Sequence, residues 1–155
     1  MNLQTTGEEA NYARYLSAAE KLQPVVRDVV KDDWAFILAS WKKSARESDP
    51  WVPSYRYFDF AEAEISTYRN RGARFRVASD PEDSNFIWGW ACSEAGVLHY
   101  VYVRTSSREQ GVAGQLVADA GLKQPVTCTH WTEWATKIAH KRPGALVFAP
   151  DRKKK

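Results

Sequence analysis

The sequence predicts one α/β (α+β) domain, in which helices flank a central sheet that is mixed and mostly antiparallel. Its 155 residues fit a single domain with a short appendage, and a hydrophobic fraction of 44% is enough for one real core. Apolar residues recur at helical spacing before residue 72, and the period then changes, with alternation over 73–79. Strands within 73–103 are joined by connections too short for a crossover, so they form an antiparallel meander.

The first half of the chain is predicted to be mainly helical. Trp34, Ile37 and Trp41 lie on one face of an amphipathic helix, and Gly72 stands where a C-cap glycine is expected. The predicted elements are a helix over 8–22, a strand over 25–30, a helix over 33–46, a proline-interrupted aromatic loop over 47–59 and a helix over 60–71.

The second half is predicted to contain most of the sheet. Residues 125–129 follow 97–103 through a helical crossover, so these two strands should be parallel. The predicted elements are strands over 73–79, 85–93 and 97–103, a helix over 111–121, a strand over 125–129, a helix over 131–141 and a strand over 145–149. The division is an N-terminal helical appendage over 1–23, one domain over 24–150 and a basic tail over 151–155.

Composition excludes several classes of protein. No run approaches 18 apolar residues, which argues against a membrane-spanning helix, and the N-terminus lacks the plan of a secretory signal. Cys92 and Cys128 are too few for a disulfide framework and lack metal-ligand spacing, so we expect a cytoplasmic protein without a metal. The net charge of +3 depends on the tail, because without Arg152–Lys155 the chain has 18 basic and 19 acidic residues. Such a tail is compatible with nucleic-acid binding and with a solvated terminus.

The loop after residue 103 carries the clearest functional signal. A strand that ends at Val103 leads into a loop and then a helix, so backbone N–H groups converge at the helix N-terminus. Gly111 and Gly114 allow a close approach to an anion, and Arg108 adds a charged donor. The loop lacks the Gly-Lys-Ser/Thr of a P-loop and the G-x-G-x-x-G dinucleotide fingerprint. The sequence therefore predicts a site for a phosphate or pyrophosphate.

This loop resembles the acetyl-CoA loop of the GNAT acyltransferases, whose pattern Arg/Gln-x-x-Gly-x-Gly/Ala is filled by Arg108, Gly111 and Ala113. The resemblance covers about residues 24–149 and is nearest to small GNAT-like proteins of tailed phages. It implies a sheet that splays between strands 97–103 and 125–129, with the acyl-CoA bound in the gap. The residues that it assigns to acetyl-CoA, or to another acyl-CoA, are Tyr102, Val103, Arg108, Gln110, Gly111, Val112, Ala113 and Gly114.

The catalytic groups are less well defined. The family usually has a tyrosine as general acid in the helix after the splayed strand, but that helix here reads WTEWATKIAH and contains no tyrosine. His130 is the best-placed group for proton transfer, since it ends the strand beside the expected splay. Tyr100, Tyr102 and Thr132 are alternatives for the acid, and Glu133 is a candidate base or cation-binding group. A structural or surface role remains open for each histidine.

The acceptor pocket is expected between the first two helices of the domain, their connecting loop and the splayed strand. The candidate substrate-binding residues are Ser40, Trp41, Ser44, Trp51, Tyr55, Tyr57 and His99, the last on the face opposite Leu98, Tyr100 and Tyr102. An aromatic pocket suits a planar or cationic acceptor.

The resulting functional hypothesis is an acyl-CoA-dependent N-acyltransferase that acts as a monomer or homodimer on a small-molecule or macromolecular amine. Two alternatives remain open: a phage DNA-modification enzyme similar to the Mom group, acting in the cytoplasm of the host cell, and a non-catalytic GNAT-fold binding protein. The first predicts contacts with nucleic acid, and the second predicts CoA binding without turnover.

Overall fold

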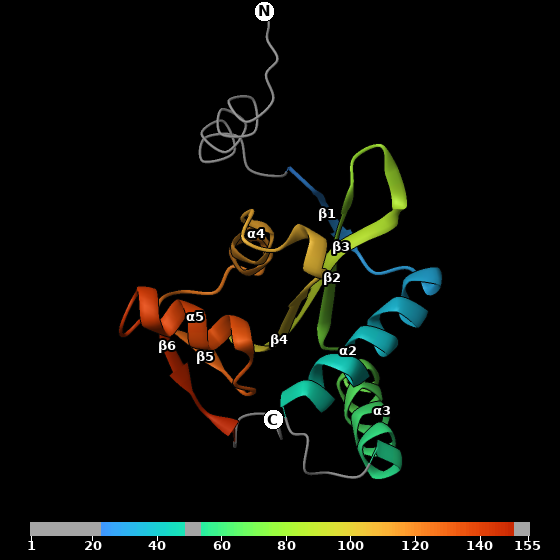
Figure 1. Cartoon of the computed structure of the whole chain (residues 1–155), viewed down its shortest axis with the longest axis horizontal. Helices are drawn as coiled ribbons and strands as arrows, with labels where there is room; N and C mark the ends of the chain where they lie inside the picture. Colours follow the sequence, from blue (N-terminus) through green and yellow to red (C-terminus); the bar gives the residue numbers. More distant parts are fainter. Residues whose placement is uncertain (1–22, 49–53, 151–155) are drawn as a thin grey trace, which may run out of the picture.

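The computed structural model describes residues 23–48 and 54–150, and the side chains of these residues other than 45–48, 54–58 and 133. The elements in this part of the chain alternate between a sheet and the helices that flank it (Figure 1). They are β1 (Val25–Asp28), η1 (Lys31–Asp33), α2 (Trp34–Ser48), α3 (Ser54–Asn70), β2 (Arg74–Asp80), β3 (Asp83–Glu94), β4 (Val97–Val103), η2 (Thr105–Ser107), α4 (Val112–Asp119), β5 (Val126–Cys128), α5 (Glu133–Lys141) and β6 (Leu146–Phe148).

The strands form one six-stranded sheet in the order β1-β2-β3-β4-β5-β6. Pairing is antiparallel from β1 to β4 and parallel between β4 and β5 and between β5 and β6. This confirms the predicted mixed, mostly antiparallel sheet with flanking helices. The predicted helix over 8–22 and the basic tail over 151–155 lie outside the described residues.

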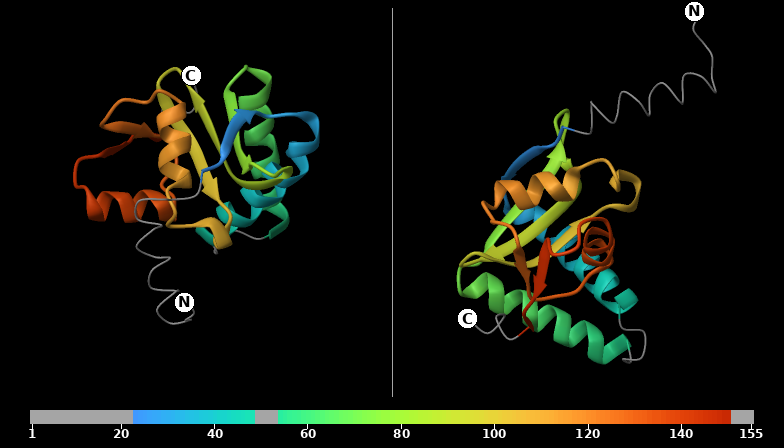
Figure 2. Two further views of the ribbon diagram at one scale, coloured as in Figure 1. Left: turned by 90° about the horizontal axis from the view of Figure 1, so that it is seen from above. Right: turned by 90° about the vertical axis from the view of Figure 1, so that its left-hand side faces the viewer.

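Helices lie on both sides of the sheet (Figure 2). Helices α2 and α3 cover one side, where Ile37, Trp41 and Tyr68 pack on Trp90 and other sheet residues. Helix α4 covers the opposite side, where Val112 and Leu116 pack on a second apolar cluster. Each side of the sheet therefore has its own helices and its own core.

The predicted aromatic loop over 47–59 is wrong in its second part, because α3 begins at Ser54 rather than at residue 60. Pro53 directly precedes the helix, and no glycine or proline occurs between Ser54 and Asn70. A proline is tolerated before or at the first turn of a helix, since its missing N–H has no helical partner there. Pro53 therefore marks the start of the helix rather than the middle of a loop.

A β-bulge in β4 disturbs the alternation of side chains. Cys92 pairs with Tyr100 and Ser93 pairs with Leu98, so His99 is an extra residue between the two pairs. Leu98 belongs to the core under α4, whereas Tyr100 belongs to the core under α2 and α3. His99 stacks on Tyr68 of α3, with the ring centroids 4.0 Å apart. The expectation that His99 lies opposite Tyr100 and Tyr102 is therefore wrong, since it assumed strict alternation.

The strands β4 and β5 separate at this bulge, after Leu98. They pair only through Val97 and Leu98 on β4, and the Thr129 N–H donates to the Leu98 carbonyl at 3.1 Å. From Tyr100 to Val103, β4 has no β5 partner, which is the splay expected between 97–103 and 125–129. No helix in the described ranges is long and apolar enough to cross a membrane.

Candidate active site

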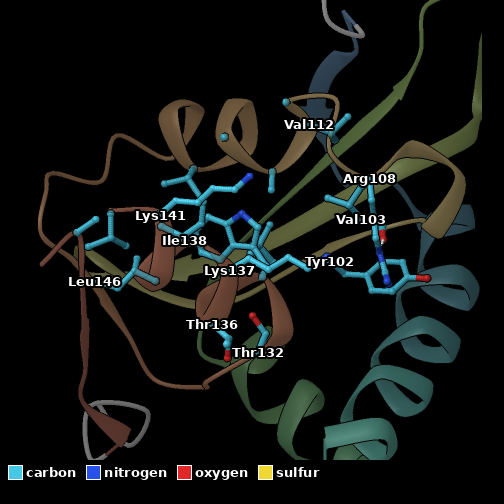
Figure 3. Close-up of a pocket in the computed structure, with 18 of the residues that line it drawn as sticks. Tyr102, Val103, Arg108, Val112, Thr132, Thr136, Lys137, Ile138, Lys141 and Leu146 are labelled. Atoms are coloured by element: carbon cyan, nitrogen blue, oxygen red, sulfur yellow. Dashed lines mark hydrogen bonds between the residues drawn. The ribbon is translucent and has the colours of Figure 1, made fainter. Parts of the chain in front are cut away.

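A cavity of about 780 Å³ lies where β4 and β5 separate. Its walls are the end of β4, the loop and first turns of α4, and one side of α5 (Figure 3). Figure 3 shows Tyr102, Val103 and Arg108 on one side of this space, and Lys137, Ile138 and Lys141 of α5 on the other. The size lies within the range of about 300–1,000 Å³ that is typical of ligand pockets.

Unpaired backbone of β4 forms one wall of the cavity. The Arg104 N–H donates to the Trp88 carbonyl at 2.7 Å, so in an antiparallel pair the backbone of Tyr102 also faces β3. The backbone groups of Val101 and Val103 therefore point away from β3, into the splay. The Val103 carbonyl accepts a hydrogen bond from Arg108 Nε at 2.8 Å. The Val101 amide and carbonyl and the Val103 amide are left facing the cavity.

The N-terminus of α4 forms the end of the cavity nearest this wall. Gly111 is the N-cap residue with φ of 86°, a conformation that favours glycine. The first helical hydrogen bond runs from Gln115 N to Gly111 O at 3.1 Å. The amides of the three lining residues Val112, Ala113 and Gly114 therefore have no partner inside the helix, and the helix dipole favours an anion beside them.

Basic side chains surround the cavity. Arg108 of the loop, Lys137 and Lys141 of α5 and Arg142 line it, whereas Glu109 is the single acidic residue among the described lining residues. Lys137 Nζ lies 4.0 Å from Glu109 Oε2 in an exposed pair. The surplus of positive charge fits a ligand that carries several phosphates.

The residues predicted to bind acyl-CoA converge on this cavity with one exception. Tyr102, Val103, Arg108, Gly111, Val112, Ala113 and Gly114 line it. Gln110 does not line the cavity, and its side-chain amide nitrogen Nε2 donates to the Ser106 carbonyl at 3.4 Å. Arg108 also folds back on β4, with its guanidinium carbon 5.8 Å from the centre of the Tyr102 ring.

The residues predicted to bind the acceptor do not converge in the same way. Ser40 and Trp41 are buried in the core beneath α2, where Ser40 Oγ accepts from Trp90 Nε1 at 2.8 Å. His99 is 1% exposed. Ser44 lines the cavity, and its hydroxyl is hydrogen-bonded to the Tyr100 hydroxyl. Trp51 and the side chains of Tyr55 and Tyr57 lie outside the described part of the chain.

The predicted catalytic residues are placed at three different positions. Tyr102 lines the cavity, and Tyr100 is buried beside His130. Glu133 is the first residue of α5, and its side chain is not among those that the structure describes. His130 lies on the α2–α3 side, and its neighbours in sequence, Trp131 and Thr132, line the cavity. Thr132 caps α5, since its hydroxyl accepts from the Ala135 amide at 3.1 Å.

A chain of hydrogen-bonded polar groups runs through His130, and most of its members were not predicted from the sequence. Arg71 donates to both carboxylate oxygens of Glu94, at 2.7–3.0 Å. Glu94 Oε1 lies 2.8 Å from His99 Nε2, and His99 Nδ1 lies 2.9 Å from Thr129 Oγ1. These contacts join the guanidinium of Arg71, directly after α3, to Thr129, directly after β5.

The same chain continues through His130 to α3. His130 Nδ1 lies 3.0 Å from Thr129 Oγ1 and 2.9 Å from the His99 carbonyl oxygen. His130 Nε2 lies 3.0 Å from Glu64 Oε2, which also accepts from the Tyr68 hydroxyl at 3.1 Å. Glu64 and Tyr68 are four residues apart on α3, a spacing that places them on one helix face.

The surroundings shift several pKa values. Hydrogen bonds from Arg71 lower the pKa of Glu94, and burial lowers the pKa of His99 despite its bond to Glu94. Burial raises the pKa of Cys128 to about 11 and also raises that of Cys92. Both cysteines are therefore neutral thiols at physiological pH and lack the ionised form that nucleophilic chemistry needs. Among the described residues, no group of His, Cys, Asp and Glu could hold a metal.

Comparison with solved structures gives likenesses to several acetyltransferases. The chain is similar to a histone acetyltransferase HPA2 and related acetyltransferase from Corynebacterium glutamicum, with a TM-score of 0.51 and 21% identity over 64% of this chain and 70% of that chain. It is also similar to a GCN5-related N-acetyltransferase from Rhodopseudomonas palustris, with a TM-score of 0.49, 16% identity and 65% of each chain covered. A third likeness is to the ribosomal-protein-alanine N-acetyltransferase from Brucella melitensis, with a TM-score of 0.46, 13% identity, and 82% and 79% of the two chains covered.

These likenesses bear on the fold alone, because all three identities are low. The matched part spans just under two thirds of the Rhodopseudomonas protein's length. No protein-family model and no curated protein matches the sequence.

Proposed function

We propose that this chain, whose fold is that of the GNAT acetyltransferases, is an acyl-CoA-dependent N-acyltransferase. The observation that carries the proposal is the cavity at the splay, which joins unpaired β4 backbone to the free amides of α4. An acyl-CoA has the matching parts, since an amide-containing arm ends in a thioester and the other end carries phosphates. The acceptor is an amine of unidentified structure.

Each part of the cavity has a role in this function. The amides of Val112, Ala113 and Gly114 bind the pyrophosphate, and the basic rim adds long-range attraction. The free backbone groups of Val101 and Val103 hold the pantetheine arm as an added strand would be held. A β4 amide that faces the thioester carbonyl stabilises the negative charge that develops on its oxygen.

The reaction is a direct transfer. The amine nitrogen attacks the carbonyl carbon, a carbon–nitrogen bond forms and the carbon–sulfur bond breaks. The nitrogen loses one proton and the departing sulfur gains one, so no other reactant is needed.

Gly114 offers a sharp test of the cofactor site. It is exposed in the first turn of α4, and a Cβ atom added there meets nothing within 4 Å. In Gly114→Asp, the new carboxylate suits the helix N-terminus, so the fold should persist, but it repels a bound pyrophosphate. We expect the Kd for acetyl-CoA, measured by titration calorimetry, to rise at least ~10-fold, which corresponds to about 1.4 kcal/mol.

Gly114→Ala is the matched control. It adds a methyl group in open space and no charge, so the Kd should stay within about twofold of wild type, while alanine favours the helix by up to ~1 kcal/mol. If the Gly114→Asp and Gly114→Ala variants bind acetyl-CoA equally well, the pyrophosphate does not bind at the N-terminus of α4. No binding of acetyl-CoA, CoA or longer acyl-CoAs by the wild type would overturn the proposed function.

Turnover is tested separately from binding. Release of free CoA thiol is followed in the presence of acetyl-CoA and a panel of amines that includes small polyamines, lysine peptides and DNA. Thiol release that depends on one class of amine supports the enzyme. Binding of acetyl-CoA without release on any amine favours a non-catalytic binding protein with the same fold.

A further inference from the structure

We propose that His130 and Glu64 hold the proton exchanged during acyl transfer, and that Thr129, His99 and Glu94 position His130 by fixing its tautomer. The inference rests on the proposed function and assigns residues to its proton-transfer step. It follows from the donors and acceptors of the buried polar chain, taken in order from its charged end.

The chain starts at the fixed negative charge of Glu94. Arg71 holds this carboxylate through three contacts of 3.0 Å or less, so Glu94 accepts hydrogen bonds and does not donate them. His99 Nε2, at 2.8 Å, must then carry a proton. Because His99 is buried and its pKa is lowered, the ring is neutral and Nδ1 is unprotonated. An unprotonated Nδ1 accepts its bond from the Thr129 hydroxyl at 2.9 Å.

This use of the Thr129 proton decides the state of His130. A hydroxyl has one proton, and the longer contact from Thr129 Oγ1 to the His99 carbonyl, 3.5 Å, is the poorer place for it. Thr129 Oγ1 therefore accepts from His130 Nδ1. The His99 carbonyl, 2.9 Å from the same nitrogen, is also an acceptor only. Both partners require a proton on His130 Nδ1.

The exchangeable position is consequently Nε2. It lies 3.0 Å from Glu64 Oε2, a contact that needs one proton between the nitrogen and the oxygen. Tyr68 donates to the same oxygen and keeps the carboxylate in place. The side chains of His130 and Glu64 are 18% and 29% exposed, whereas His99 is 1% exposed. His99 and Thr129 are sealed from solvent, whereas both ends of the polar chain are partly exposed, since Glu94 is 17% exposed at the far end.

The position of the pair suits a role at the acceptor side. Rings of Trp41, Tyr68 and Tyr100 surround His130, with centroids 5.4–6.4 Å from its own. The titratable groups that face it are Glu64 and Tyr68 from α3, and His99 and Tyr100 from β4. The Trp41 indole N–H is buried and has no hydrogen-bond partner in the described part of the chain.

Protons balance when the pair serves as the carrier. Its held proton passes to the departing sulfur as the carbon–sulfur bond breaks. The proton that the nitrogen loses on forming the amide then refills the pair. Two of the other candidates already have partners, since the Tyr100 hydroxyl is bonded to Ser44 and the Thr132 hydroxyl caps α5.

The ring nitrogens of the free protein give a test that does not depend on CoA. Long-range ¹H–¹⁵N spectra of ¹⁵N-histidine-labelled protein separate protonated from unprotonated nitrogens, and the chain has three histidines to assign. We expect opposite states in two neighbours: an unprotonated Nδ1 in His99 and a protonated Nδ1 in His130. An unprotonated Nδ1 in His130, or a protonated one in His99, would overturn the proposed chain of bonds.

Variants then test the role of the pair. His130→Asn should lower kcat at least ~100-fold and leave the Kd for acetyl-CoA within about twofold, since His130 does not line the donor cavity. His140→Asn is the matched control on the exposed end of α5 and should keep wild-type values. Wild-type kcat in His130→Asn would overturn the role of the pair, whereas absence of acetyl-CoA binding in the wild type would overturn the proposed function instead.

The positioning role of Thr129 is tested with a second pair of variants. Thr129→Ser keeps the hydroxyl and should retain activity, while Thr129→Val should lower kcat without changing the Kd. Equal kcat in these two variants would overturn the positioning role.

Discussion

At the scale of single residues, the buried imidazole of His99 should make folding stability depend on pH. Its pKa is lowered in the folded state, mainly by burial, so the unfolded chain binds a proton more readily. The contribution of neutral His99 to the free energy of unfolding is therefore complete above about pH 6.5, the ordinary pKa of histidine, and is lost as the pH falls below that value. Glu94, whose pKa is also lowered, loses its contribution only below its own ordinary value of about 4.3.

We expect the free energy of unfolding, measured with urea, to fall between pH 7.5 and pH 5.5. His99→Gln should be less stable at pH 7.5 and should lose part of this pH dependence. His140→Asn, which changes an exposed ring, should behave as the wild type does. A wild-type stability that is flat or rises on acidification would contradict the neutral state of His99.

The sequence identified some site residues and missed their partners for a physical reason. His130 and Arg108 could be selected because each occupies a known place beside a strand end or a helix start. Glu64 and Glu94 could not, because their roles depend on which strands pair and where the bulge lies. The i, i+4 spacing of Glu64 and Tyr68 was the one available signal, and it is common on helix faces.

At the scale of elements, the pairing of β3 with β4 depends on Gly89. A Cβ atom at this position would lie 2.5 Å from the Tyr102 carbonyl oxygen and 3.3 Å from the Val103 Cα. Because both are backbone atoms of the neighbouring strand, neither can move without disturbing the cavity wall. We expect Gly89→Ala to destabilise the protein by about 1–3 kcal/mol in urea unfolding.

Gly114→Ala serves as the control for that measurement, since it meets no atom within 4 Å. Gly89→Ala should also weaken acetyl-CoA binding, because Tyr102 and Val103 shift with it. A Gly89→Ala variant that is as stable as the wild type would show that β3 and β4 lie further apart than they do in the structure.

Element boundaries were predictable where a local signal marks them and not elsewhere. The prediction of β4 over 97–103 is confirmed, since the turn at Ala95 and Gly96 marks its start and the polar loop after Val103 marks its end. Helix α3 was placed six residues late, because Pro53 and Asp59 were both read as loop markers. The bulge at His99 leaves no mark in the sequence, as it arises from the mismatch between β3 and β4.

At the scale of the whole molecule, one structural event creates both halves of the candidate site. When β4 and β5 separate after Leu98, a cavity opens toward α4 and α5, and His130 stays on the side of α2 and α3. The order of the elements and the splay could be anticipated from the sequence through the crossover and the GNAT-like loop. The arrangement of the polar chain required the packed structure, because its members come from α3, β3, β4 and the segment directly after β5.

Amide chemical-shift mapping shows whether acyl-CoA binds in the splay between β4 and β5. Acetyl-CoA is titrated into ¹⁵N-labelled protein and each backbone amide is followed. We predict the largest changes at Val112, Ala113 and Gly114 and at Val101 and Val103, which frame the cavity. Changes confined to other faces of the molecule, or none at millimolar acetyl-CoA, would show that acyl-CoA does not bind in the splay.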